Sequence, residues 1–200
     1  MDIRLDTLKK EMSLYLDHFQ EQDWDVFEDR LSPVSYKKGD TVFPASEICK
    51  KVLFIVNGIL ASEYQAKEDL TITRFFKSKG LCSNIVSLFN QQLANDRIFA
   101  ITNVEGVLIP YELMLENYLY SNGIGIYFRK RLLEILLEDK QFMSMKTVSG
   151  LKPKLTFLQE DYPEVILDAP WKYIANFMGV TPEWLSRNLQ KKKVNADNNP

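Results

Sequence analysis

Short apolar or alternating runs recur between turn residues from Tyr36 to about Ile109, and this pattern restricts the fold more than any other feature of the chain. β-Branched and aromatic residues are dense in these runs, and evenly spaced short strands are typical of an antiparallel sandwich or small barrel. Asn57-Gly58 lies between two such runs and predicts a two-residue hairpin. One helical interruption is predicted at Asn84–Leu93. We therefore expect an antiparallel β domain in the middle of the chain.

Helical patterns flank this β region on both sides. Apolar residues at three- and four-residue spacings indicate an amphipathic helix within the first ~30 residues. Pro110 fits the first turn of a helix, and a longer helical pattern runs from Ile124 to about Val148. This long helix has to pack either on its own β domain or on a second copy of the chain. Its apolar stripe consists of Ile124, Phe128, Leu132, Ile135, Phe142 and Met145.

The segment from Trp171 to Lys193, WKYIANFMGVTPEWLSRNLQKKK, has the features of a helix-turn-helix motif. Ala175 is a small residue where two helices would cross, and Gly179 can adopt the positive φ of a turn. Thr181 followed by Pro182 is a favourable start for the second helix. The predicted inward residues are Ile174, Leu185 and Leu189, and the predicted outward residues are Glu183, Trp184, Ser186, Arg187 and Asn188.

The same segment is basic although the chain is not. It holds five lysines and arginines against one acid, a local net charge of +4, whereas the whole chain has a net charge of −2. The overall balance gives no general sign of nucleic-acid binding, but a local basic patch can neutralise DNA phosphates. An ordinary helical hairpin with a solvated basic end is the alternative interpretation.

Composition excludes several other kinds of site. Two cysteines and one histidine, His18, are too few for a disulfide framework, a four-cysteine or two-cysteine, two-histidine zinc site, or a four-cysteine iron–sulfur cluster. No Ser-His-Asp pattern, P-loop, GxGxxG or HExxH motif is present, so we do not expect an enzyme. The first residues lack the apolar region of a signal peptide, and the apolar run Val52–Val56 is too short to cross a bilayer. These features predict a cytoplasmic protein.

The order of a β-rich domain, a long helix and a helix-turn-helix resembles that of the bacterial Crp/Fnr transcription regulators, from about Leu31 to Lys193. The stretches YKKGDTVF…EICKKVLFIVNGIL and YPEVILDAPWKYIANFMGVTPEWLSR are similar to the family's opening strands and C-terminal domain. The resemblance implies an α+β chain with three parts. These are a sensor domain at 1–120 (an N-terminal helix and a cyclic-nucleotide-binding-type antiparallel β jelly roll), a dimerisation helix at 121–148 carrying the apolar stripe, and a helix-turn-helix DNA-binding domain at 149–200.

The resemblance also implies a homodimer that binds a palindromic operator on double-stranded DNA, with RNA polymerase as a further partner. Glu183, Trp184 and Arg187 match the positions that contact base edges, where Glu accepts from cytosine and Arg pairs with guanine. Thr181 and the lysines Lys191 to Lys193 match phosphate contacts. The predicted DNA-binding set is Thr181, Glu183, Trp184, Ser186, Arg187, Lys191 and Lys192.

Two departures from the family pattern keep a second hypothesis open. Asn188 stands where the family usually has an apolar residue, and seven residues after Lys193 are too few for a β-hairpin wing. The second hypothesis is a non-DNA signalling module, in which the β domain binds a small ligand and the C-terminal helices dock a protein.

The stretch KGLCSNIVSLFNQQLANDRIFAIT matches the family's cyclic-nucleotide phosphate cassette. Gly80 is kept, but the Gly-Glu pair falls on Asn84-Ile85, and an Ile side chain cannot accept a hydrogen bond from a ribose hydroxyl. An unpartnered buried hydroxyl costs about 1–3 kcal/mol, so we do not expect cyclic AMP or cyclic GMP as the effector. Cys82 is either a small buried hydrophobe or a redox thiol. No cofactor or metal is predicted, an unidentified small effector stays open, and the pocket residues are Gly80, Cys82, Asn84, Ile85 and Arg97.

Overall fold

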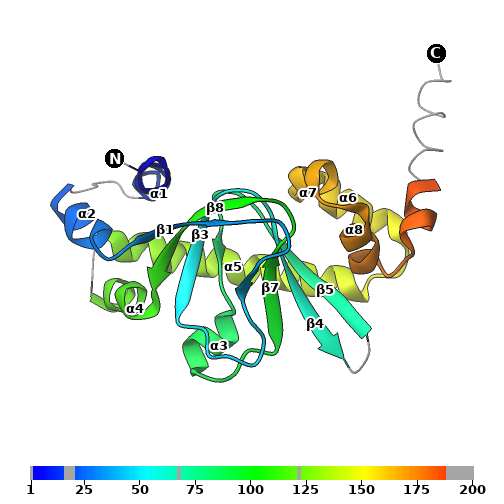
Figure 1. The fold of residues 1–200 in the computed structure, drawn as a ribbon, viewed down its shortest axis with the longest axis horizontal. Helices are drawn as coiled ribbons and strands as arrows, with labels where there is room; N and C mark the ends of the chain where they lie inside the picture. Colours follow the sequence, from blue (N-terminus) through cyan, green and yellow to red (C-terminus); the bar gives the residue numbers. More distant parts are fainter. Residues whose placement is uncertain (1, 16–20, 67–68, 121–122, 188–200) are drawn as a thin grey trace, which may run out of the picture.

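The computed structural model describes residues 2–15, 21–66, 69–120 and 123–187. Two four-stranded sheets form its centre, and every strand pair in them is antiparallel. The first sheet has the strand order β1-β8-β3-β6 and the second β2-β7-β4-β5, so the predicted antiparallel β domain is confirmed (Figure 1). The strands are β1 Ser32–Tyr36, β2 Thr41–Phe43, β3 Lys51–Asn57, β4 Leu60–Ala66, β5 Asp69–Phe76, β6 Leu81–Cys82, β7 Asp96–Ala100 and β8 Val104–Pro110.

The hairpin predicted at Asn57-Gly58 is wrong. β3 pairs with β6 and β8 in the first sheet, whereas β4 pairs with β5 and β7 in the second. Gly58, with φ of +101°, carries the chain from one sheet to the other, and a Cβ there would lie 2.3 Å from the Asn103 carbonyl oxygen. The Asn-Gly pair therefore marks a tightly packed crossing between the sheets.

Helices lie at both ends of the β sandwich (Figure 1). α1, α2 and α4 gather at one end and α6, α7 and α8 at the other, and α5 runs along the molecule between them. The predicted long helix from Ile124 and the helical interruption between β6 and β7 are both confirmed. The helices are α1 Ile3–Ser13, α2 Glu21–Glu28, α3 Ile85–Asn90, α4 Tyr111–Tyr120, α5 Ile124–Thr147, α6 Leu151–Asp161, α7 Pro163–Asp168 and α8 Trp171–Met178, and residues 182–187 are also helical.

The apolar interior forms two clusters. The first joins the β domain to the N-terminal helices through Met12 and Phe27 and to α5 through Phe128. The second joins the second sheet to the C-terminal helices, with Phe75 of β5 and Phe177 of α8 among its members. The C-terminal helices therefore share a core with the sheet.

Strands β4, β5 and β7 of the second sheet are buried on both faces. Successive residues are buried over 60–63 in β4, 74–76 in β5 and 98–100 in β7. Because successive side chains of a strand point to opposite faces, an unbroken run of buried residues means that both faces are covered. One face looks into the sandwich and the other supports α6 to α8.

Candidate nucleic-acid interface and effector pocket

Residues 171–187 form two helices joined by a tight turn. α8 ends at Met178, and Gly179 follows with φ of +75°, the left-handed conformation that favours glycine. The Gly179 N–H donates to the Asn176 carbonyl at 3.1 Å and the Val180 N–H donates to the Ala175 carbonyl at 3.0 Å. These bonds satisfy carbonyls at the end of α8 and direct the chain into residues 182–187, which are helical.

The predicted start of the second helix is confirmed. The Thr181 hydroxyl accepts from the Trp184 N–H at 3.2 Å, as an N-cap does, and Pro182 occupies the first helical position. The predicted inward side chains are confirmed as well, because Ile174, Ala175 and Leu185 are fully buried. Leu189 lies outside the described residues.

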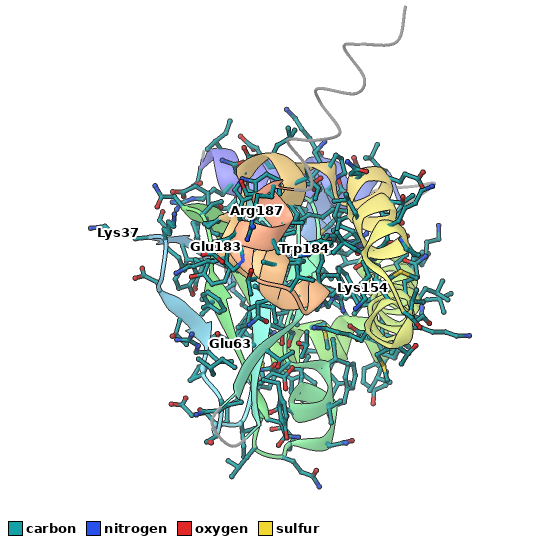
Figure 2. The ribbon with its side chains drawn as sticks, turned by 90° about the vertical axis from the view of Figure 1, so that its right-hand side faces the viewer. Lys37, Glu63, Lys154, Glu183, Trp184 and Arg187 are labelled. Atoms are coloured by element: carbon teal, nitrogen blue, oxygen red, sulfur yellow. The ribbon has the colours of Figure 1, made fainter. Side chains whose placement is uncertain are left out.

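The predicted outward residues are exposed. Figure 2 shows Glu183, Trp184 and Arg187 together on one side of the second helix, with Lys154 of α6 nearby. Trp184 is 41% exposed. Thr181 and Ser186 are exposed too, whereas Asn188, Lys191 and Lys192 lie outside the described residues.

Two lysines that sequence reasoning missed lie at the end of α8. Lys146 Nζ donates to the Phe177 carbonyl at 3.3 Å and Lys154 Nζ donates to the Met178 carbonyl at 3.3 Å. Cations stabilise the C-terminal end of a helix because its last carbonyls carry partial negative charge. Burial, and secondarily the Lys154 ammonium, lower the pKa of Lys146 to about 8. Both lysines hold the turn that precedes the outward helix.

α8 is attached to the edge of the second sheet. Asn176 Oδ1 accepts from the Ile72 N–H of β5 at 2.6 Å, and its Nδ2 donates to the Leu70 carbonyl at 2.8 Å. The ring of Tyr173 packs edge-on against Phe99 of β7, with ring centroids 5.4 Å apart. The side-chain amide thus takes the place of a neighbouring strand along β5.

The stripe predicted for the dimer interface is mostly not available to a partner. Ile124, Phe128, Ile135 and Phe142 are at most 4% exposed because they pack inside the chain, and Leu132 is half-buried. Of the two packing partners that the sequence allowed, the chain's own β domain and C-terminal helices take this face. The opposite face of α5 is apolar and exposed, and it carries Leu133, Leu136, Leu137 and Met143.

A cavity of about 310 Å³ lies between the second sheet, the α3 region and α5. Asn84 and Ile85 line it, as predicted for the effector pocket, whereas Gly80, Cys82 and Arg97 do not. Gly80 lines a separate hollow of about 200 Å³. The lining residues of the larger cavity include Ser62, Thr73, Arg74, Asp96, Ile98, Asp139 and Phe142.

Arg97 lies on the other face of the second sheet. Its guanidinium pairs with Glu63 of β4 and lies 4.6 Å from the ring centroid of Phe99, a residue of the C-terminal core. The arginine that lines the cavity is Arg74, which pairs with Glu138 and Asp139 of α5. The sequence window was right, but the side-chain face was wrong, because register decides the face and register is not visible in the sequence.

Neither cysteine is accessible. Cys82 is fully buried, and this burial raises the pKa of its thiol well above the ordinary value. Cys49 is 6% exposed, and its Sγ lies 3.3 Å from the Ser83 Oγ. Of the two interpretations of Cys82, the environment fits a small buried hydrophobe. His18 lies outside the described residues.

Within the part of the chain that the structure describes, no group of three or more His, Cys, Asp or Glu side chains is placed to hold a metal ion. Over the same residues, no helix is both long and apolar enough to cross a membrane.

Comparison with known proteins finds similar structures but no similar sequences. No protein-family model matches the chain, and no curated protein matches it. A structure assigned to the Crp/Fnr family of transcriptional regulators, from Eubacterium rectale, is 18% identical over 88% of this chain and 85% of its own, with a TM-score of 0.65. FixK2 from Bradyrhizobium japonicum is 16% identical over 83% of this chain and 86% of its own, with a TM-score of 0.69. The c-di-GMP-responsive regulator CLP of Xanthomonas campestris is 15% identical over 88% and 93%, with a TM-score of 0.61. The chain therefore has the fold of the Crp/Fnr transcriptional regulators, with antiparallel β-sheets of the cyclic-nucleotide-binding type followed by helices.

Proposed function

We propose that the chain is a DNA-binding transcription regulator of the Crp/Fnr type, which acts as a homodimer in the bacterial cytoplasm and is not an enzyme. We assign the sensor to residues 1–120, the dimerisation helix to 121–148 and the DNA-binding domain to 149–200. One observation carries the proposal. Glu183, Trp184 and Arg187 are exposed on a short helix whose inward residue, Leu185, is fully buried among α6 to α8.

The chemistry of these side chains suits base recognition. An arginine can donate two hydrogen bonds to guanine O6 and N7, and a glutamate can accept from the cytosine amino group. Arg187 Nε donates to the Glu183 carbonyl at 3.3 Å, which holds the arginine stem along the helix. Thr181 and the lysines Lys191 to Lys193 are assigned to phosphates, where they position the helix without reading sequence, and Ser186 completes the DNA-binding set.

The exposed face of α5 supports assembly with a second copy. Leu133, Leu136, Leu137 and Met143 are each at least 50% exposed. Two such faces packed about a two-fold axis would bury the leucines and present two DNA-binding helices to successive major grooves. A two-fold protein then binds a palindromic operator, and RNA polymerase stays a predicted partner.

The DNA assignment is tested by selecting bound sequences from random double-stranded DNA. We expect a palindromic consensus for the full chain and loss of preference at one symmetric base pair in Arg187→Ala, at a cost of about 1–3 kcal/mol. Arg30→Ala is the matched control, because Arg30 is an exposed arginine paired with Glu116 far from the helix. If the full chain selects no sequence with or without cell extract, the proposal is wrong and the protein-docking alternative gains support.

The dimer assignment is tested by sedimentation equilibrium. We expect Leu133→Glu and Leu137→Glu each to shift the chain toward monomer, because a carboxylate at a dimer seam is desolvated without a partner. Leu167→Glu on α7 is the control, since Leu167 is an 80% exposed leucine elsewhere on the surface. Unchanged association of the α5 variants would contradict the assignment.

A further inference from the structure

The cavity beside α3 and α5 is acidic. Its ionisable lining residues are Arg74, Asp96 and Asp139, so two carboxylates face one guanidinium. Cyclic-nucleotide recognition needs the opposite balance, because the phosphate is an anion that requires an unoccupied cation. The net negative charge of this cavity therefore does not follow from the cyclic-nucleotide-binding type of fold.

The guanidinium of Arg74 is already occupied. It pairs with Asp139 and lies 2.5 Å from Glu138 Oε2, so both of its terminal nitrogens are held by carboxylates of α5, whereas its buried Nε has no hydrogen-bond partner among the described residues. Its guanidinium carbon is 4.6 Å from the ring centroid of Phe76 and 5.8 Å from that of Phe142. The side chain is 7% exposed. An anionic ligand would therefore compete with Glu138 and Asp139 for the terminal nitrogens, which carry the guanidinium's ion pairs.

Asp96, by contrast, has no cationic partner among the residues that the structure describes. Its Oδ2 accepts from the Ser62 hydroxyl at 2.8 Å and from the Thr73 hydroxyl at 3.2 Å. The neighbouring Arg97 points to the other face of the sheet and pairs with Glu63. Two hydroxyl donors fix the carboxylate in the cavity but leave its charge uncompensated.

Apolar side chains form much of the remaining wall. Ile85 begins α3, Ile98 lies on β7 and Phe142 lies on α5, and all three line the cavity. Val86, Leu93 and Met143 also line it and are 69%, 63% and 72% exposed, so they form an apolar rim. The cavity volume of about 310 Å³ is at the lower end of the range for small-molecule sites. Asp139 is paired with Arg74, so one carboxylate without a cationic partner, Asp96, faces a cavity with apolar walls, and this arrangement suits an amphiphilic cation.

We propose that this cavity binds a small organic cation, in which an ammonium pairs with Asp96 and an apolar body packs against Ile85, Ile98 and Phe142. The charge selects against cyclic nucleotides, whose phosphate would meet Asp96 and an arginine that is already paired. The binding site stands on its own geometry, and only the role of the ligand as effector rests on the proposed regulatory function.

The test uses the full chain and two sets of matched fragments in ligand-observed NMR titrations. One set is phenethylamine, 2-phenylethanol and phenylacetate, and the other is isopentylamine, isopentyl alcohol and isovalerate. We expect each amine to bind at least about tenfold more tightly than the alcohol or carboxylate of its set, because only the ammonium can form an ion pair with Asp96. Cyclic AMP is expected to bind more weakly than either amine.

Asp96→Asn keeps the shape of the side chain and removes its charge. It should weaken amine binding about tenfold and leave the alcohols unchanged, whereas Asp168→Asn, the same change on exposed α7, should alter neither. Ile85→Lys, which places a cation at the cavity wall, should weaken amine binding as well and replaces Asp96→Asn if that variant does not fold. The proposal is overturned if no fragment binds, if a carboxylate or cyclic AMP binds better than the amine, or if amine affinity survives both changes. DNA selection is scored separately, so a chain that binds amines but no operator would lose the regulatory role and keep the site.

Discussion

The fold lowers the pKa of one buried side chain, Lys146. It extends from α5 to the end of α8, where its ammonium lies 4.7 Å from the ring centroid of Phe177. Burial and the nearby Lys154 lower its pKa from 10.5 to about 8. Since the unfolded chain keeps the ordinary pKa, the unfolded state binds more protons than the folded state between these values.

The free energy of unfolding should therefore contain a Lys146 contribution that rises with pH above about 8. The penalty for burying the charge is fully present below pH 8 and disappears as the folded chain releases the proton. Burial also raises the pKa of the Cys82 thiol, which adds an opposite slope near pH 9 to every variant. We therefore expect urea titrations between pH 7 and 9.5 to give a more positive slope of stability against pH in the parent chain than in Lys146→Met. Measurements stop there because burial raises the pKa values of Tyr127 and Tyr162, which adds an opposite slope at higher pH. Lys152→Met, at an exposed lysine, should keep the parent slope, and an equal slope in Lys146→Met would contradict the assignment.

Gly179 is required for its conformation and not for its size. A Cβ at this position would meet no atom within 4 Å, but φ is +75°. Replacement by alanine should therefore cost about 1–2 kcal/mol of stability, which is the price of a left-handed L-residue. Asparagine, which tolerates this region, should cost less, and urea unfolding of the two variants checks the order. Equal losses for both would indicate that another interaction is involved.

Local residue chemistry was predictable where one residue decides the outcome. Thr181, Pro182 and Gly179 were assigned correctly because capping and positive φ depend on the residue itself. The side of the sheet on which Arg97 lies was not predictable. Arg97 pairs with Glu63 and its neighbour Asp96 pairs with Tyr64, so a one-residue difference in the alignment of β7 decides the face, and this alignment has no signature in composition or spacing.

At the scale of elements, α5 illustrates the limit of periodicity. Three- and four-residue spacings correctly grouped Ile124, Phe128 and Ile135 on one face, because the geometry of a helix fixes which residues lie together. Periodicity does not say what covers a face, and α5 is apolar on two faces. Leu133 and Leu137, which the predicted stripe left out, form the exposed face. The Asn57-Gly58 hairpin failed for a related reason, since a turn signal does not name the strands that pair.

Asn176 should control the attachment of α8 to the second sheet. In Asn176→Ala the Ile72 N–H loses the acceptor that now lies 2.6 Å away, and the Leu70 carbonyl loses a donor. Losing a hydrogen bond worth about 1 kcal/mol should speed exchange of the Ile72 amide with solvent by about fivefold to tenfold.

Hydrogen-exchange NMR provides this measurement, and Asn103→Ala is its control. Asn103 Oδ1 accepts from the Lys38 N–H at 3.0 Å, which is a similar side-chain to backbone bond in a distant turn. That variant should change the Lys38 amide and leave Ile72 unaffected. If Asn176→Ala leaves the Ile72 amide as protected as in the parent, α8 is held by apolar packing alone.

At the scale of the whole molecule, Phe142 links the cavity to the C-terminal helices. Its ring lines the cavity and also lies within 5.6 Å, centroid to centroid, of Phe157, Tyr162 and Phe177. Phe142→Ala should destabilise the chain by about 3–5 kcal/mol, because it opens a void among packed rings. Leu167→Ala, at an 80% exposed leucine of α7, should change stability far less. Thermal and urea unfolding of both variants tests this, and a loss below about 1 kcal/mol for Phe142→Ala would contradict the linking role.

The general fold was predictable because its parts follow one another in the sequence and each has its own hydrophobic pattern, short alternating runs for the strands and three- and four-residue spacings for the helices. The contact between the parts was not predictable. Phe99 and Phe177 lie in one core cluster but are far apart in the sequence, and each fits the hydrophobic pattern of its own element. The cavity was located only in part for the same reason. Asn84 and Ile85 belong to one local stretch, whereas Arg74, Asp96 and Asp139 come together from three separate elements.

Because β4, β5 and β7 are buried on both faces, they limit which substitutions such a protein can accept. Wherever two neighbouring strand residues are buried on opposite faces, as Ile98 and Phe99 are, neither face can accept substitutions freely. A scan of all single replacements should find few tolerant positions in 60–63, 74–76 and 98–100, and more in β1, whose residues are exposed or half-buried. New ligand preferences would then be acquired through α3, whose Ile85 and Val86 line the cavity and lie outside both sheets.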